Sequence, residues 1–194
     1  MKRKRILAMI LAVASCLSLA VSASAANTPN RKATDFRDFD CTAWYAEAVS
    51  AAVDNGLLYG KSSTIIDPNG DMTRAEMAAI INRSFGCYKT ADISQYNDVS
   101  KSKWYYKDVA LAVQMGTYNG RSASAMAPDA PISRQEAMTV VARALELDYD
   151  SYSKTDLSAF SDRSEISNWA LPYVRAMVGA DYIHGRGKVL APLD

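Results

Sequence analysis

Residues 96–105 read YNDVSKSKWY: an aromatic residue, an Asn-Asp-Val segment and, after a short gap, a Trp-Tyr pair. Similar segments begin at Phe36 and, less completely, at Phe160. Counted from each tryptophan, glycine recurs 16 residues on in all three copies, proline 24 residues on in the first two and 23 in the third. The residues in register are Trp44, Trp104 and Trp169, then Gly60, Gly120 and Gly185, then Pro68, Pro128 and Pro192. Matches at constant spacing indicate three copies of one unit.

Each copy is predicted to be a helix, a loop and a second helix. In the first copy one helical face carries Tyr45, Val49 and Val53, and Asn55-Gly56 is a typical helix end. The loop glycines and Pro68 exclude a continuous helix, and a second apolar stripe contains Met77, Ile80, Ile81 and Phe85. One hairpin of about 50 residues buries little surface, so the copies should pack against each other.

The predicted fold is therefore all-α, built from tandem helix-loop-helix repeats at 36–87, 96–147 and 160–194. In the third repeat the first helix is predicted roughly at 168–178. The chain stops at Asp194 before a second helix, so we expect the third repeat to be incomplete.

The first 25 residues have the three parts of a secretory signal peptide. A basic start, MKRKR, precedes an apolar run from Ile6 to Val21 and the small residues Ala23-Ser24-Ala25. Cleavage is predicted after Ala25. The residues before Cys16 also resemble a lipoprotein cleavage box, but the apolar run continues after Cys16, which favours ordinary cleavage. The run is shorter than the roughly 20 residues of a bilayer-spanning helix, so we expect no membrane span in the mature chain.

Charge argues against a nucleic-acid partner. The chain has 22 basic and 21 acidic residues. Without the four cations of residues 2–5 it keeps 18 basic and 21 acidic residues, a net charge of −3. A nucleic-acid binder needs a strongly basic face, which this balance does not favour.

The pattern of Phe-x-Asp-Val, Trp-Tyr, two glycines, proline and Thr-Arg-Ala-Glu resembles the S-layer homology (SLH) domain of bacterial surface proteins. The resemblance covers nearly all of residues 36–194. It implies a pseudo-threefold, three-pronged helical domain that binds secondary cell-wall polymer, often pyruvylated, and holds a protein on the cell envelope. The chain departs from the pattern at Phe39, Ser133, Gln135, Arg163 and Ala170.

The second helices begin with a capping-box sequence. Thr73 with Glu76, and Ser133 with Glu136, have the spacing at which the hydroxyl and the carboxylate each bind a backbone N–H of the first turn. Capping does not explain Arg74 and Arg134, since a cation is disfavoured at a helix N-terminus. A bound carboxylate or phosphate would explain them, and a structural salt bridge is the alternative.

Three further features suggest a ligand groove. A cation follows each loop glycine, and these cations, Lys61, Arg121 and Arg186, either form an anion site with Gly60, Gly120 and Gly185 or are solvated loop charges. The tryptophans either stack on sugars or anchor the core. The motif aspartates Asp38, Asp98 and Asp162 are predicted to cap or brace the first helices, and binding of sugar hydroxyls is the alternative.

The cysteines and acids give no catalytic or metal site. In a helical hairpin Cys41 and Cys87 would lie close together, so a disulfide is one alternative and a small buried side chain at Cys87 is the other. Two thiols with the single His184 do not make a zinc site, and we expect no cofactor.

Three functions remain open at the level of sequence. The first is attachment to an anionic wall polysaccharide or to peptidoglycan, without catalysis by these residues. The second is a protein-assembly scaffold of the surface layer. The third is a targeting module for a wall enzyme whose catalytic part is absent from this chain.

Overall fold

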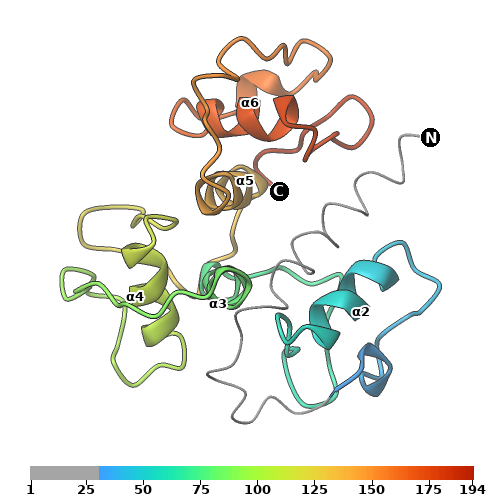
Figure 1. Cartoon of the computed structure of the whole chain (residues 1–194), viewed down its shortest axis with the longest axis vertical. Helices are drawn as coiled ribbons and strands as arrows, with labels where there is room; N and C mark the ends of the chain where they lie inside the picture. Colours follow the sequence, from blue (N-terminus) through green and yellow to red (C-terminus); the bar gives the residue numbers. More distant parts are fainter. Residues whose placement is uncertain (1–30) are drawn as a thin grey trace. The chain divides into compact units, whose positions relative to one another are not determined.

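The computed structural model describes residues 31–194. The predicted signal peptide and Cys16 lie outside these residues. The described chain forms two compact units, 31–70 and 71–194, and each is described here by itself. Residues 31–194 contain helices and no strand (Figure 1), as the sequence predicts, and no helix among them is long and apolar enough to cross a membrane.

The first unit is small and has one α-helix. The 3-10 helix η2 (Ala33–Asp35) packs on α2 (Ala46–Asp54). Its buried hydrophobic cluster contains Ala33, Phe36, Val53 and Ile66.

The second unit has four α-helices and a 3-10 helix. These are α3 (Arg74–Phe85), α4 (Tyr106–Gln114), α5 (Arg134–Ala144), η3 (Arg163–Glu165) and α6 (Leu171–Gly179). Their limits agree with the apolar stripes and end signals of the sequence, and the first helix of the third copy begins three residues later than predicted.

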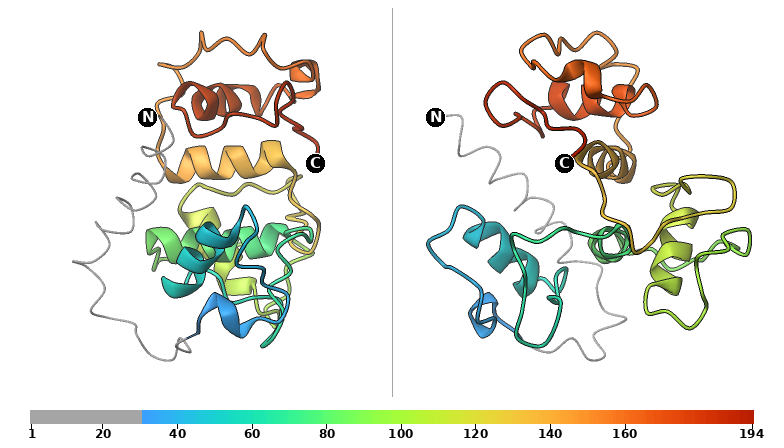
Figure 2. Two further views of the ribbon diagram at one scale, coloured as in Figure 1. Left: turned by 90° about the vertical axis from the view of Figure 1, so that its right-hand side faces the viewer. Right: turned by 180° about the vertical axis from the view of Figure 1, so that it is seen from behind.

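The helices pair across the repeat boundaries. Helix α3 packs on α4, and α5 packs on α6, the latter pair lying side by side in Figure 2. The two helices of the second repeat, α4 and α5, do not pack against each other. The prediction of a helical hairpin within that repeat is therefore wrong. The apolar faces that pack together belong to helices of consecutive repeats.

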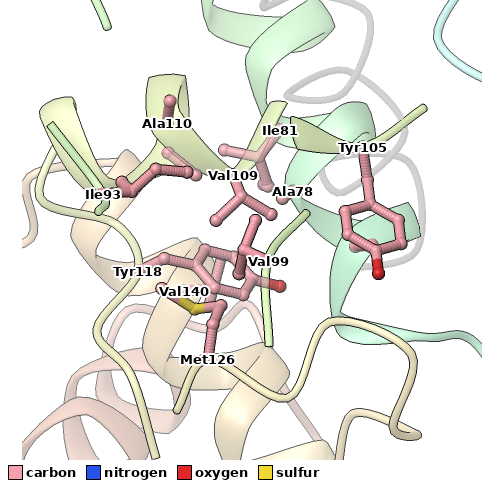
Figure 3. Close-up of a cluster of buried hydrophobic side chains, with 12 residues drawn as sticks. Ala78, Ile81, Ile93, Val99, Tyr105, Val109, Ala110, Tyr118, Met126 and Val140 are labelled. Carbon is pink, nitrogen blue, oxygen red and sulfur yellow. The ribbon is translucent and has the colours of Figure 1, made fainter. Parts of the chain in front are cut away.

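The α3–α4 core shows this pairing directly (Figure 3). Ala78 and Ile81 of α3 meet Val109 and Ala110 of α4, and loop and α5 side chains complete the cluster. Small alanines on both helices allow close approach, so the pair buries a continuous apolar seam. A second core, around Phe160, Val174 and Met177, joins α5 to α6.

An aspartate fixes the loop of every copy. Asp98 accepts the backbone N–H groups of Met126 at 2.9 Å and Ala127 at 2.7 Å. Asp38 binds residues 66 and 67 in the same way, and Asp162 binds residues 190 and 191. The prediction that these aspartates cap the first helices is wrong, since each binds backbone N–H groups 28 and 29 residues further along the chain, beyond its first helix.

The aspartate also stabilises a strained backbone. Ala127 has φ +54°, a left-handed conformation that costs a non-glycine residue about 1 kcal/mol, and it precedes Pro128. Burial alone would raise the pKa of Asp98, but the N–H donors of Met126 and Ala127 outweigh it and lower the pKa below its usual range. The ionised carboxylate therefore holds the loop.

Replacing Asp98 with Ala should lower the free energy of unfolding by about 2 kcal/mol. The change removes two charge-assisted hydrogen bonds and leaves the Met126 N–H without its acceptor. Urea denaturation followed by circular dichroism measures it. The control is Asp150→Ala, at another exposed aspartate, which should change stability by less than about 0.5 kcal/mol; equal effects would contradict the proposed role of Asp98.

Candidate functional site

The capping boxes form at the starts of α3 and α5. The Thr73 hydroxyl accepts the Glu76 N–H at 3.2 Å, and the Glu76 carboxylate accepts the Thr73 N–H at 2.8 Å. Ser133 and Glu136 make the same exchange at 3.4 and 2.9 Å. These local contacts place each glutamate over the first turn of its own helix.

The first-turn N–H groups of both helices are already occupied. Arg74 N donates to the carbonyl of Ala130 at 3.0 Å, and Ala75 N donates to that of Pro128 at 2.9 Å. At α5, Arg134 N and Gln135 N donate to Asp194 at 2.7 Å and Pro192 at 3.0 Å. A loop of the following copy thus satisfies these donors, so they are not available to a bound anion at either helix start.

Arg74 is a structural residue. It is 4% exposed, and its Nε donates to the Met126 carbonyl at 2.9 Å. One Nη donates to Glu136 at 2.9 Å and the other to the Asn119 carbonyl at 3.0 Å. Its guanidinium also lies 5.2 Å from the Tyr118 ring centroid. Of the two alternatives for Arg74, a bound anion or a structural salt bridge, the structure shows the salt bridge, with Glu136.

Arg121 binds the same carboxylate from the solvent side. Its Nε and Nη2 reach the two Glu136 oxygens at 3.1 and 3.0 Å, a bidentate pair, and Nη2 also donates to Pro131. Burial alone would raise the pKa of Glu136, but Arg121, the Ser133 N–H and the charge of Arg74 outweigh it and lower that pKa. The hydrogen bond to Glu136 raises the pKa of Arg121. This loop cation is therefore paired internally.

The corresponding junction between the second and third copies is arranged differently. Arg134 Nε donates to the Leu190 carbonyl at 2.9 Å, as Arg74 does to Met126. Arg186, the counterpart of Arg121, pairs with Asp194 at 2.8 Å. Among the ion pairs of residues 31–194, none involves Arg134. Burial and the nearby charge of Arg186 lower the pKa of Arg134, and they outweigh the nearby carboxylates of Asp194 and Asp162, which raise it.

The tryptophans are exposed. Trp44, Trp104 and Trp169 have 90%, 60% and 52% of their surface accessible, so they are not core anchors. Trp104 meets Tyr105 edge to face, with ring centroids 5.4 Å apart. The next residue in each copy, Tyr45, Tyr105 or Ala170, is the buried one. Exposed indole faces at one repeated position are suited to stacking on sugar rings.

Sequence reasoning missed the role of Tyr105. Its ring is buried and its hydroxyl donates to Asp129 at 2.9 Å, while burial raises the pKa of Tyr105 to about 12. The sequence signal that could have identified it was the repeated Trp-Tyr pair, Trp44-Tyr45 and Trp104-Tyr105, whose tyrosines are both buried.

The loop glycines have a packing reason. A Cβ at Gly120 would lie 2.5 Å from the Tyr96 ring, and one at Gly185 would lie 2.6 Å from Phe160. Gly60 likewise meets Phe36 within the first unit. Each glycine therefore allows the motif aromatic to pack against the loop. Lys61, next to Gly60, lies on the exposed surface of the first unit.

The remaining candidates show no chemistry of their own. Cys41, in the first unit, and Cys87, in the second, are both free thiols in this structure, and their pairing stays a prediction. Cys87 is half-buried, and its thiol lies 3.7 Å from the Leu111 carbonyl. Within residues 31–194 no three His, Cys, Asp or Glu side chains are placed to hold a metal ion.

Comparison with known proteins identifies the repeats. Residues 35–78 and 95–138 both match the model of the S-layer homology domain. These two segments are similar to S-layer homology repeats. They coincide with the first two copies of the sequence pattern and include the capping boxes, Arg74, Arg134 and Arg121.

Similar proteins are much longer than this chain. It is 32% identical over 163 residues, 84% of its length, to the Surface-layer 125 kDa protein of Lysinibacillus sphaericus, of which the match covers 13%. It is 25% identical over 185 residues to an Endoglucanase of Bacillus sp. (strain KSM-635), covering 94% of this chain and 19% of the enzyme. It is 27% identical over 123 residues to S-layer protein sap of Bacillus anthracis, covering 63% and 14% respectively.

Replacing Glu136 with Gln should destabilise the protein by about 3 kcal/mol, because Arg74 would remain buried without its counter-ion. The amide keeps the volume of the side chain and removes its charge. Urea unfolding measures the change, with Glu146→Gln as the matched exposed control. A loss below about 1 kcal/mol, or an equal loss in the control, would show that the ion pair is not needed.

Stability should also fall in acid. The pKa values of Glu136, Asp98 and Asp162 are lowered in the folded protein, so their stabilisation is complete above the unfolded values, 4.5 for Glu and 3.8 for Asp, and is lost as pH falls through the folded values. Thermal unfolding between pH 7 and 2.5 measures the profile. Glu136→Gln should have a shallower acid slope than the parent chain; an identical slope would contradict the assigned pKa shift.

Proposed function

We propose that this chain anchors a secreted bacterial protein non-covalently to the cell envelope by binding an anionic secondary cell-wall polysaccharide. The observation that carries the proposal is the match of two segments to the S-layer homology domain. Similarity to surface-layer proteins of other bacteria supports a place at the cell wall or surface. Secretion rests on the signal peptide predicted from residues 1–25.

The third segment belongs to the same proposal. We infer that residues 160–194 are an incomplete third repeat, which the family match does not include. Asp162 binds residues 190 and 191 as Asp98 binds residues 126 and 127, and Arg134 binds the Leu190 carbonyl as Arg74 binds that of Met126. Three prongs about a pseudo-threefold axis are the arrangement that we propose for the complete domain.

Charge favours the junction between the second and third copies as the polymer contact. Arg74 and Arg121 share the carboxylate of Glu136, whereas Arg134 has no ion pair among the described residues. A carboxylate on the polymer, such as that of a pyruvylated sugar, would bind there as Glu136 binds at the first junction. Exposed tryptophans would add stacking on neighbouring sugars, and several weak contacts on one polymer raise the total affinity.

A targeting role is compatible with the same binding. The match to an Endoglucanase, which covers 94% of this chain and 19% of the enzyme, favours a module that brings a wall-associated enzyme to its place. Anchoring and targeting use the same polymer contact and differ in what the module carries.

Co-sedimentation with Gram-positive wall sacculi tests the proposal. Residues 26–194 should bind sacculi that retain their secondary polymer and should lose that binding when the polymer is stripped. Replacing Arg134 and Arg186 with Gln should weaken binding at least tenfold, and added salt should weaken the parent chain, because the contact is ionic.

Lys103→Gln with Lys107→Gln is the charge-matched control, since both lysines are exposed and lie in the second repeat. Equal weakening of the two double variants would replace the specific site with general charge attraction. Undiminished binding to stripped sacculi would indicate peptidoglycan, and no binding by folded protein would overturn the anchoring proposal.

A further inference from the structure

A pocket lies in the third copy, outside the arginine junctions. The linker before η3, the η3 helix and the first half of α6 line an open pocket of about 410 Å³, a volume within the size range of small-molecule sites. Its lining includes Lys154, Asp156, Leu157, Arg163, Leu171 and Arg175. All these residues belong to the second compact unit.

Basic side chains dominate the pocket. Lys154, Arg163 and Arg175 contribute three positive charges, and Asp156 is the one carboxylate in the lining. The Asp156 oxygens accept the backbone N–H and the hydroxyl of Ser158, at 2.8 and 2.7 Å, which lowers the pKa of Asp156. None of the ion pairs in residues 31–194 involves the three cations. The pocket therefore carries a net positive charge. By contrast, Arg74, Arg121 and Arg186 of the same unit each pair with a carboxylate.

Backbone carbonyls hold both guanidinium groups in place. Arg175 Nη1 donates to Ser153 at 3.0 Å, and Arg163 Nη1 donates to Phe160 at 3.3 Å. The Nε–H of Arg175 is buried and has no acceptor among the described residues. A buried N–H without an acceptor is costly, and fixed guanidinium groups lose little freedom when they bind an oxyanion.

The repeat architecture does not require these cations. Arg175 lies six residues after its tryptophan, where the other copies have Ser50 and Ala110. Arg163 follows the loop-closing Asp162, where the second copy has the buried Val99. The third copy has thus exchanged a core position for an exposed cation beside a pocket. A structural role common to the repeats does not explain that change.

We propose that this pocket is an oxyanion site, specific to the third copy, that binds a single phosphate or carboxylate group. Arg175 and Arg163 bind the oxyanion and Lys154 adds charge from the rim, while Leu157 and Leu171 supply apolar walls that a sugar or similar small group could contact. The site is independent of the Arg134 junction and of wall anchoring, so it stands or falls by its own test.

NMR titration of ¹⁵N-labelled residues 26–194 tests the site. The probes are inorganic phosphate and glucuronate, with glucose as the neutral control, and the signals are the Arg175 Nε–H and the backbone amides of residues 153–158. We expect saturable shifts in the millimolar range with phosphate, glucuronate or both, and none with glucose. Response to one anion alone identifies the group that the site prefers.

Lys154→Gln with Arg163→Gln should weaken the anion response at least fivefold and leave thermal stability unchanged, since both side chains are exposed. Lys103→Gln with Lys107→Gln removes the same charge elsewhere and should leave the affinity within twofold of the parent chain. Three results would overturn the proposal: no saturable shift in the parent chain up to 50 mM of either anion, an equal response to glucose, or equal weakening by both double variants.

Discussion

The carboxylate of Glu136 is the contact on which the second unit depends. It completes the capping box of α5, neutralises the buried Arg74 of α3 and binds Arg121 of the connecting loop. One residue can serve three segments because a capping box directs its glutamate back over the helix start, where loop and helices meet. Since Arg74 is almost fully buried, its charge is tolerable only while this carboxylate is present.

The same junction explains how the repeats connect. Carbonyls of one loop accept the first N–H groups of the preceding repeat's second helix, so each helix start is satisfied by the copy that follows it. At the start of α3 these backbone contacts are joined by the ion pair between Arg74 and Glu136. At α5 the backbone contacts are present, but Arg134 makes no ion pair among the described residues, and Asp162 and Asp194 act on it only as nearby charges. The difference between two similar junctions therefore separates a structural arginine from a candidate ligand residue.

Sequence patterns predicted the helices and their capping contacts well, but they did not predict which helices pack together or which distant residues meet. Apolar periodicity placed the helices, and the Thr-x-x-Glu and Ser-x-x-Glu spacings predicted the contacts seen at Thr73 and Ser133. Periodicity shows which face of a helix is apolar but not which helix covers it, so the α3–α4 pairing was missed. The contact of Asp98 with residues 126 and 127 was missed for a related reason, although its 28-residue spacing recurs in every copy. Burial of Arg74 depended on that unrecognised packing.

The central claim is that Arg134 contacts the wall polymer while Arg74 serves the fold. Titration of the ¹⁵N-labelled chain with purified secondary polymer, observed at the arginine Nε–H signals, tests it most directly. We predict a saturable shift of the Arg134 signal and no change at Arg74, whose Nε–H is bonded to Met126. A shift at Arg74 with Arg134 unchanged, or no shift at either while the polymer binds, would contradict the account.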